Sequence, residues 1–152
     1  AQEHVKQSHA LAKLLLSDVR EAVSEMREGC AIDILAAIEP LVQLMPNLDI
    51  RLHADPGLTL EDSSVAQVIL RCVQELITNT IKHARATALK VSVERKTDEL
   101  IIQYRDNGIG ISDSQDKLGL GLLTIRERTA IIGGRLELKT GTNKGISLTI
   151  TI

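Results

Sequence analysis

The sequence predicts an α+β fold, a two-layer sandwich in which helices cover one face of a mixed, largely antiparallel sheet. Two observations predict this class. Segments with an apolar residue at every second position occur in adjacent pairs, which indicates hairpins rather than repeated strand–helix–strand units. Segments with helical periodicity lie before and between these pairs, and 43% of the 152 residues are hydrophobic, enough to fill one core between two layers.

The first 28 residues predict one long helix that precedes the sandwich. They contain no Gly or Pro, and Gly29 is the first plausible stop. Heptad spacing relates Val5, His9, Ala12, Leu16, Val19, Val23 and Met26. Such a stripe is typical of a helix that pairs with another helix, either in a second molecule or in its own domain.

A second helix and a strand are expected next. Asp33 is a suitable N-cap for a helix that runs to about residue 45, with a kink or restart at Pro40 and an end at Pro46. The alternation of apolar and polar residues that follows predicts a strand of a half-buried sheet through Leu48, Ile50 and Leu52.

A loop at 55–57 leads into the longest expected helix of the sandwich, over residues 63–84. Its core side carries Val65, Ile69, Val73, Leu76 and Thr80. One other face carries Arg71, Glu75, Asn79 and Lys82, with His83 at its edge. A solvated polar face is the ordinary explanation, but a carboxylate, a carboxamide and an ammonium group in line can also coordinate Mg²⁺ and meet phosphate charge.

The rest of the chain predicts two hairpins with a glycine-rich stretch and a helix between them. In chain order these are strands over 89–95 and 100–105 with a turn at 96–98, a glycine-rich stretch over 106–121, a helix over 119–132 ended by Gly133 and Gly134, and strands over 136–139 and 146–152 around a turn at 141–145. The pairing of these strands is what predicts the antiparallel part of the sheet.

Two glycine clusters lie in the glycine-rich stretch. The run 106–110, DNGIG, follows a strand directly; its glycines permit a turn and a close backbone approach to a flat ligand, although it also suits an ordinary turn. The run 119–122, GLGL, opens a helix, where free N–H groups can bind phosphate oxygens. The sequence contains no P-loop and no dinucleotide-binding G-x-G-x-x-G.

Composition excludes several classes of function. The 18 basic and 20 acidic residues give a net charge of -2, and Tyr104 is the only residue among Phe, Trp and Tyr, so a base-stacking nucleic-acid surface is not expected. Cys30 and Cys72 form no C-x-x-C pair and are interpreted as buried, reduced thiols. With no apolar run of roughly 18 residues and no signal peptide, the chain is expected to be cytoplasmic, which leaves open a parent protein anchored in the inner membrane.

The three clusters, in this order, resemble the Bergerat ATP-binding fold shared by histidine kinases, type II topoisomerases, Hsp90-type chaperones and mismatch-repair ATPases. The run 74–84, QELITNTIKHA, resembles the N box of that family, and 106–110 resembles its first G box. The run 119–128, GLGLLTIRER, is similar to the second G box of the histidine kinases that partner response regulators of the nitrate-response type. Residues 18–28 are similar to the second helix of the dimerisation and phosphotransfer domain in the same subfamily.

For the helix over 63–84, the resemblance implies contacts with Mg-ATP. Asn79 is the implied Mg²⁺ ligand, and Lys82 and His83 are implied to lie near phosphate or ribose. Glu75 is the implied catalytic residue, which polarises the attacking group either as a base or by orientation.

For the glycine clusters, the resemblance implies contacts with adenine and the phosphates. Asp106 would accept a hydrogen bond from the adenine amino group, while Gly108 and Gly110 would make room for the base. Gly119 and Gly121 would let the lid and the helix start close over the phosphates. The full implied cofactor-binding set is Asn79, Lys82, His83, Asp106, Gly108, Gly110, Gly119, Leu120, Gly121, Leu122 and Ser147, the last in a hairpin where the family often has Gly-Thr.

The implied activity is that of a protein-histidine kinase, which transfers the γ-phosphoryl group of ATP to a histidine outside this fragment and then to a response regulator. His4 and His9 are not followed by an acidic residue, as the acceptor usually is, so neither is expected to be phosphorylated. Residues 1–28 are expected to belong to the dimerisation helix of a homodimer and residues 32–152 to form the catalytic domain. The alternatives are a serine kinase of the anti-sigma-factor kind and a non-catalytic interaction module on the same fold.

Overall fold

The structure, a computed structural model, describes residues 31–43, 48–110, 120–141 and 143–152. The expected helix over 1–28, the end of the second helix at 44–47 and the segment 111–119, which includes Gly119, lie outside the described residues. The side chains of Leu41, His83 and Leu120 lie outside them as well.

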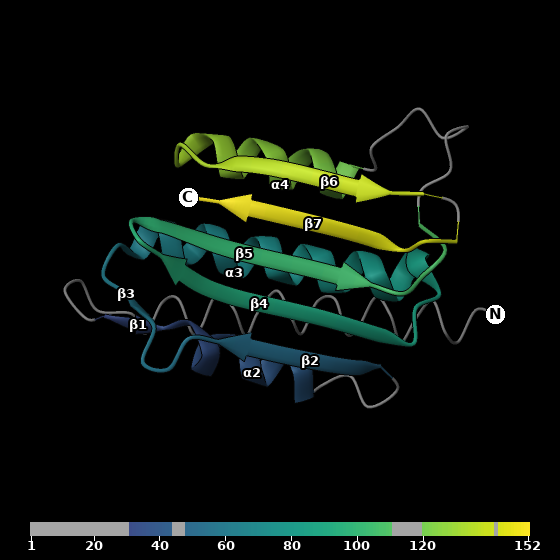
Figure 1. The fold of residues 1–152 in the computed structure, drawn as a ribbon, viewed down its shortest axis with the longest axis horizontal. Helices are drawn as coiled ribbons and strands as arrows, with labels where there is room; N and C mark the ends of the chain where they lie inside the picture. Colours follow the sequence, from purple (N-terminus) through teal and green to yellow (C-terminus); the bar gives the residue numbers. More distant parts are fainter. Residues whose placement is uncertain (1–30, 44–47, 111–119, 142) are drawn as a thin grey trace.

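A five-stranded mixed sheet forms one layer of the molecule (Figure 1). In spatial order its strands are β2 (Asp49–Ala54), β4 (Ala88–Lys96), β5 (Glu99–Asp106), β7 (Ile146–Thr151) and β6 (Arg135–Thr140). β2 pairs with β4 in parallel, and the other neighbouring pairs of this sheet are antiparallel. The predicted sheet is therefore confirmed, with β4–β5 and β6–β7 as the expected hairpins.

The helices α2 (Ile34–Gln43), α3 (Ser63–Asn79) and α4 (Leu120–Ile131) lie on one face of this sheet, behind it in Figure 1. α3 occupies the middle of the helical layer and contacts both α2 and α4. Two layers form because each helix has one apolar side and the sheet has one apolar face, and each buries the other. The other face of the sheet is open in this view.

Local hydrogen bonds set the ends of the helices. Asp33 accepts a hydrogen bond from the Ala36 N–H at 3.0 Å, as expected of an N-cap residue. Asp62 caps α3 in the same way. At the end of α4, Gly133 adopts a φ of +74°, and the Gly134 N–H donates to a carbonyl in the last turn at 2.9 Å. The predicted cap at Asp33 and the glycine stop are thus confirmed.

Two features of the helical layer were open or different in the prediction. Pro40 lies inside α2, so the helix does not restart there, and the alternative of a kink at Pro40 stays a prediction. The expected helix over 63–84 ends as an α-helix with α3, and Thr80–Ala84 form one π-helical turn, η1. This turn ends at Arg85, whose φ of +48° is left-handed, and the Ala84 carbonyl accepts from the Ile109 N–H at 2.8 Å. A π-helical turn cannot be predicted from the spacing of apolar residues in the sequence. Here it is accompanied by a tertiary hydrogen bond, from the Ile109 N–H to the Ala84 carbonyl.

A small second sheet was not predicted. β1 (Ile32–Asp33) and β3 (Thr59–Leu60) pair antiparallel, each with only two residues. Strands this short carry no repeat of apolar and polar residues, so the sequence offers no periodic signal for them.

The hydrophobic core lies between the sheet and α3. Alternate residues of each strand face the helices; on β5 these include Leu100, Ile102 and Tyr104, all buried. α3 is buried on more of its circumference than predicted, because Cys72 and Gln74 are also buried against neighbouring elements. Among the described residues, none of the helices combines the length and the apolar character needed to cross a lipid bilayer.

Candidate functional site

The end of α3 and the turn after β5 meet around the buried Tyr104. Its hydroxyl lies in hydrogen-bond contact with the Thr80 hydroxyl and donates to Asp106 Oδ2 at 2.9 Å. Thr80 belongs to η1, whereas Tyr104 and Asp106 belong to β5, so this contact joins the helical layer to the sheet. In the sequence, Tyr104 stands out only as the single residue among Phe, Trp and Tyr, and nothing in its neighbours along the chain indicates this role.

The Asp106 carboxylate is buried and held by three donors. Oδ1 accepts from the Gly108 N–H at 2.9 Å and the Ile146 N–H at 3.2 Å, and Oδ2 accepts from Tyr104. Asp106 is only 3% exposed. A carboxylate has about four acceptor positions, so one position is left for a further donor. The side chain is therefore fixed in orientation and keeps capacity for one more hydrogen bond.

Burial raises the pKa of Tyr104 well above its usual range, and the negative charge of Asp106 and the hydrogen bond to it raise the pKa further. The phenol therefore stays neutral across the physiological pH range. A neutral phenol keeps its proton, so Tyr104 remains a donor to Asp106.

Glycines permit the close approach of the segments around Asp106. A Cβ added to Gly108 would lie 2.2 Å from the Ala84 carbonyl oxygen, and one added to Gly145 would lie 2.1 Å from the backbone oxygen of Asp106. Gly110, with a φ of +70°, approaches the β6–β7 turn in the same way. What these glycines contact is protein backbone; the room that Gly108 and Gly110 would leave for a base stays a prediction.

The start of α4 packs directly against the polar face of α3. A Cβ added to Gly121 would lie 2.3 Å from Glu75 Oε1 and 2.6 Å from Asn79 Nδ2. A larger residue at this position would displace the carboxylate or the carboxamide from the places they occupy here. The structure thus brings together Gly121, Glu75 and Asn79, three residues from two of the predicted clusters.

The N-terminus of α4 is directed to the same place. Its first N–H groups have no partner within the helix and carry the positive end of the helix dipole, which favours anions. The side chain of Leu122, however, is buried in the hydrophobic core. Leu122 can therefore meet a ligand only through its backbone, in keeping with the expectation that N–H groups at this helix start bind phosphate, which stays a prediction.

The remaining predicted residues are placed differently. Lys82 is exposed on η1, three residues after Asn79, the last residue of α3. Ser147 pairs with Arg105 and Lys139 across the sheet, so it lies on the open face, whereas Asp106 faces the helices. The structure does not bring Ser147 to the other site residues, because adjacent strand residues point to opposite faces.

The side chain of Asn107 holds the start of β4 in place, although the sequence marks this residue only as a member of the cluster 106–110. Its Oδ1 accepts from the N–H groups of Thr87 and Ala88 at 2.9 and 3.0 Å, and its Nδ2 donates to the Thr87 hydroxyl at 2.9 Å. The side chain therefore holds the segment after η1 against the turn after β5. The Asp-Asn-Gly sequence suggested a turn, but only the fold reveals this partner 20 residues away.

Cys72 lies buried and free in the interface between α3 and α4, as the sequence predicted. Burial raises its pKa to about 11, although a hydrogen bond with Thr129 and the charge of Arg128 act in the opposite direction. A thiol with this pKa is protonated and unreactive near neutral pH, so its role is packing.

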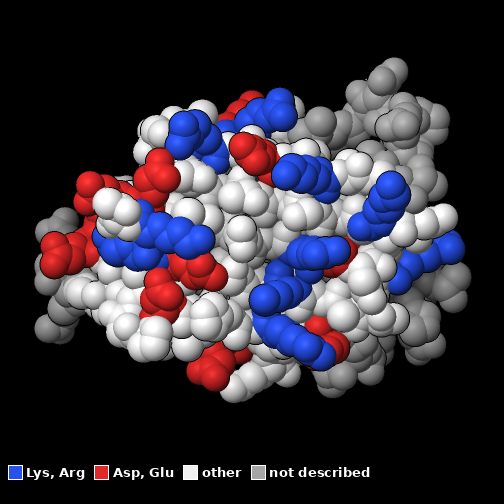
Figure 2. All heavy atoms as spheres, viewed as in Figure 1, with Lys and Arg blue, Asp and Glu red and all other residues white. Residues whose placement is uncertain are grey.

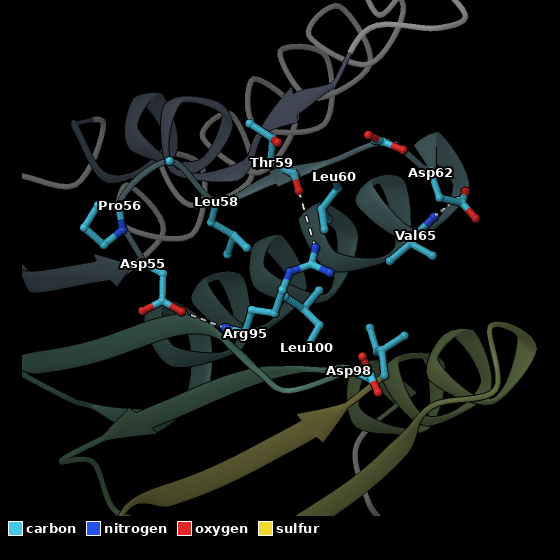
Figure 3. Close-up of a pocket in the computed structure, with 13 residues that line it drawn as sticks. Asp55, Pro56, Leu58, Thr59, Leu60, Asp62, Val65, Arg95, Asp98 and Leu100 are labelled. Carbon is cyan, nitrogen blue, oxygen red and sulfur yellow. Dashed lines mark hydrogen bonds between the residues drawn. The ribbon is translucent and has the colours of Figure 1, made fainter.

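A separate cavity of about 820 Å³ lies at the far end of the fold, beside the β4–β5 turn (Figure 3). Its wall is apolar at Leu58, Leu60, Val65, Leu100 and Ile152. Its charged lining residues are four acidic ones, Asp55, Glu61, Asp62 and Asp98, and one base, Arg95, whose backbone N–H donates to Asp55 and whose guanidinium reaches the Thr59 carbonyl. An excess of carboxylates repels phosphates, so this cavity is not where a nucleotide is expected.

A mixed sheet is backed by helices, Gly121 of α4 lies against the carboxylate and the carboxamide of α3, and the glycine turn 106–110 lies against Ala84 at the end of the same helical segment. This arrangement defines a domain of the ATP-binding class that the sequence resembles. Residues 64–152 match the family of histidine kinase-, DNA gyrase B-, and HSP90-like ATPases. The chain belongs to this family, and the family implies ATP binding. Within it, this is a catalytic domain of the two-component histidine kinase type.

Curated relatives agree with this assignment. The sensor histidine kinase DesK of Bacillus subtilis (strain 168) is 30% identical over 156 residues, which cover 100% of this chain and 40% of DesK. The signal transduction histidine-protein kinase/phosphatase DegS of Brevibacillus brevis is 27% identical over 160 residues, which cover 100% of this chain and 41% of DegS. The chain thus spans about two-fifths of the length of these relatives.

Solved structures show the same fold. The histidine kinase domain of the blue-light activated histidine kinase EL346 of Erythrobacter litoralis superposes with a TM-score of 0.72 at 19% identity, covering 95% of this chain and 74% of that chain. The histidine kinase AdeS of Acinetobacter baumannii superposes with a TM-score of 0.61 at 21% identity, covering 99% of this chain and 77% of that chain.

Proposed function

We propose that this domain binds Mg-ATP between α3 and the two glycine clusters and presents the γ-phosphoryl group to a histidine outside these residues. The observation that carries the proposal is the Asp106 carboxylate, held by three donors with one acceptor position left. A buried acceptor that is fixed in this way suits the exocyclic amino group of adenine. Guanine has a carbonyl at that position, which would leave the carboxylate facing an oxygen, so the site favours adenine.

Asn79 and Glu75 are proposed to face the phosphates. Within the described residues, no group of three or more His, Cys, Asp or Glu could hold a metal ion by itself. One carboxamide oxygen beside one carboxylate suits a Mg²⁺ ion that arrives with its nucleotide, because Mg²⁺ commonly takes few protein ligands together with substrate phosphates and water. Asn79 is therefore the proposed ligand. When bound, Mg²⁺ would neutralise phosphate charge.

The other residues are proposed to position the phosphates. The free N–H groups at the start of α4, from Leu120 to Leu122, would bind phosphate oxygens, and Gly119 and Gly121 would let this helix start lie close to α3. Lys82 and His83 would meet phosphate or ribose from η1. Glu75 would orient or deprotonate the attacking imidazole. Catalysis would then come mostly from positioning and charge neutralisation, as in other phosphoryl transfers.

We further propose the setting of the parent protein. Membership in a two-component kinase family implies a response regulator as the final acceptor of the phosphoryl group. Residues 1–28 are proposed to form part of the dimerisation helix of a homodimer, with the acceptor histidine elsewhere in the parent, and the domain would work in the cytoplasm, where ATP is available. A serine acceptor is less well supported, since the curated relatives named above are histidine kinases.

Thermal unfolding with and without Mg-ATP tests the nucleotide site. Ligand at about 100 times its dissociation constant adds about 2.7 kcal/mol to the free energy of unfolding, so the wild-type chain should show a clear upward shift in Tm. Asp106→Asn should remove most of that shift, because the amide nitrogen replaces an acceptor by a donor. Asn79→Ala should weaken Mg-ATP binding while ATP in EDTA binds the variant and the wild type alike.

The matched control is Asp98→Asn, which makes the same change at an exposed aspartate in the β4–β5 turn. This variant should keep the full shift. An equal shift in Asp106→Asn and Asp98→Asn would refute the adenine assignment. The absence of any shift in the wild type would favour a non-catalytic interaction module instead.

A further inference from the structure

The open face of the sheet carries a row of basic residues that the nucleotide site does not use. Four cations and one serine occupy consecutive strands in direct register: Arg51 on β2, Lys90 on β4, Arg105 on β5, Ser147 on β7 and Lys139 on β6. We call these five residues the basic row. Arg51, Lys90, Arg105 and Lys139 are all exposed. At about 4.8 Å between strands, the row is about 19 Å long.

Like charges placed opposite one another make this row electrostatically unfavourable for the fold. Lys90 and Arg105 are direct partners in an antiparallel pair, and Arg51 flanks Lys90 on the other side. Like charges in such positions destabilise a sheet. Asp49 pairs with Arg51 at 3.2 Å, and no ion pair within the described residues neutralises Lys90, Arg105 or Lys139.

The other end of the same face shows the ordinary arrangement. Next to the β4–β5 turn, Lys96 lies directly opposite Glu99. Lys96 also pairs with Glu94 at 3.8 Å, and Arg135 pairs with Glu99 at 3.1 Å. Figure 2, which looks onto this face, shows basic side chains gathered across the middle of the sheet and acidic ones mixed with basic ones towards the end near that turn. The same sheet therefore pairs its charges next to the β4–β5 turn, whereas in the basic row only Arg51 has an ion-pair partner among the described residues.

The surface at the basic row is also hollowed. A shallow depression of about 320 Å³ is lined by Arg51, Lys90 and Arg105 together with Asp49, Ala88, Leu89, Asp106 and Asn107. Beyond the basic row, the next row of the sheet consists of polar residues with one carboxylate at its β6 end: His53, Ser92, Gln103, Thr149 and Glu137. Cations beside polar groups and a concave surface suit a partner that brings carboxylates.

Other anionic partners fit less well. Tyr104 is the only residue among Phe, Tyr and Trp, and it is buried, so the open face offers none of these rings for a nucleic-acid base to stack on. The exposed large hydrophobic residues of the described chain are Leu35, Ile109, Leu123 and Ile131, none of them on the strands of this face, so a membrane would find no apolar residue to insert. A second copy would offer Asp49, Glu94 and Glu99 on its open face, all already paired, and Glu137, a single further carboxylate that cannot neutralise three cations.

We propose that the basic row is a docking surface for a carboxylate-rich face of another protein. The partner's acidic side chains would neutralise Lys90, Arg105 and Lys139 and so relieve a repulsion that the isolated domain retains. The side chains of the basic row lie on the open face, whereas the Asp106 carboxylate is held on the covered face by Tyr104 and the Gly108 N–H, so the row can be occupied while the nucleotide site is in use. The proposal does not depend on the proposed roles of Glu75, Asn79 or Asp106.

Two charge reversals on one strand test it. Lys90→Glu and Lys96→Glu both replace an exposed lysine of β4 on the same face and change the net charge equally. The probe is poly-L-glutamate of about 20 residues, titrated into the full chain at low and at 150 mM salt. The wild type should bind it, with affinity that falls as salt rises. Lys90→Glu should weaken binding at least about tenfold, whereas Lys96→Glu should change it less than about twofold.

Three other outcomes would overturn the proposal. Equal weakening by the two variants would mean that only net charge matters. Tighter, Lys90-dependent binding of a 20-base-pair DNA duplex or of phosphatidylglycerol vesicles would assign the basic row to those partners instead. Self-association of the wild type that Lys90→Glu abolishes, seen by sedimentation velocity, would assign it to a second copy. Arg105→Gln serves as a further variant of the basic row if Lys90→Glu does not fold.

Discussion

The two faces of β5 differ in how their polar side chains are paired, as the neighbouring residues Tyr104, Arg105 and Asp106 show. On the covered face, Tyr104 and Asp106 are buried, and each polar atom of the pair meets named partners at hydrogen-bond distance. On the open face, Arg105 lies between Lys90 and Ser147 without an opposite charge beside it. Burial makes an unmet polar group costly, whereas water tolerates one. Unpaired groups alone are therefore ordinary on the open face, and it is the repulsion between like charges in direct register that points to an acidic partner, while satisfied groups on the covered face point to a fixed site.

The largest expected effect comes from filling the close contact at Gly108. In Gly108→Ala, the new methyl group would lie 2.2 Å from the Ala84 carbonyl oxygen and 2.7 Å from its Cβ, and neither belongs to a flexible side chain. We expect the free energy of unfolding to fall by about 3 kcal/mol. Gly57→Ala is the control: Gly57, unlike Gly108, has a positive φ of +71°, but nothing lies within 4 Å, so about 1 kcal/mol should be lost to backbone strain alone. Urea denaturation measures both, and equal losses would contradict the tight packing inferred here.

Removing one hydroxyl on the covered face should have the next largest effect. Tyr104→Phe keeps the ring and removes the donor to Asp106 Oδ2, which leaves the buried carboxylate with two donors. We expect a loss of about 2 kcal/mol in the free energy of unfolding and weaker Mg-ATP binding. Arg105→Gln, at the adjacent residue on the open face, should change stability by less than about 0.5 kcal/mol. If both variants lost the same stability, the contrast between the faces would not hold.

Alkaline pH should lower the free energy of unfolding through the buried thiol of Cys72. The pKa of Cys72 is raised from 9.0 to about 11 in the folded chain, so the unfolded chain releases its proton first. This contribution to stability is complete below pH 9 and is lost as the pH rises towards 11, with about 1.4 kcal/mol gone by pH 10. Cys72→Ala should show a shallower decline between pH 8 and pH 10 in chemical denaturation. Parallel declines would show that the thiol does not titrate in this window.

The smallest effects concern the open face, and they should have opposite signs. Lys90→Glu places a carboxylate between Arg51 and Arg105, so the free energy of unfolding should rise by about 0.5 kcal/mol. Lys96→Glu removes the pair with Glu94 and places like charges opposite at Glu99, so it should fall by about as much. Precise Tm comparisons at low salt measure the difference, which 1 M salt should shrink. A decrease in both variants would mean that the basic row costs the fold nothing.

Local sequence patterns predicted most of the secondary structure. The alternation in β4 and β5, the cap at Asp33 and the glycine stop at Gly133 all lie where expected, because each depends on residues a few positions apart. The π turn η1 and the two-residue strands β1 and β3 were missed, since no repeat in the sequence marks them. The register of the sheet was not predicted either, although it alone creates the basic row.

The sequence predicted a set of residues for the candidate site, but not which of them contact one another. The resemblance pointed to Glu75, Asn79 and Gly121, and the structure brings these three together. It also pointed to Ser147, which lies on the other face of the sheet, because one step along a strand reverses the direction of a side chain.

By itself, the sequence determined the class of fold, the ATP-binding family and the segments that carry the motifs, because hydrophobic periodicity and short motifs are written in neighbouring residues. Only the tertiary structure decided that Tyr104 holds Asp106, that Asn107 holds the entry to β4, and that four cations align across the sheet. These contacts join residues whose separation along the chain carries no signal. They form because strand register and helix packing are set by burial of the whole core rather than by any one segment.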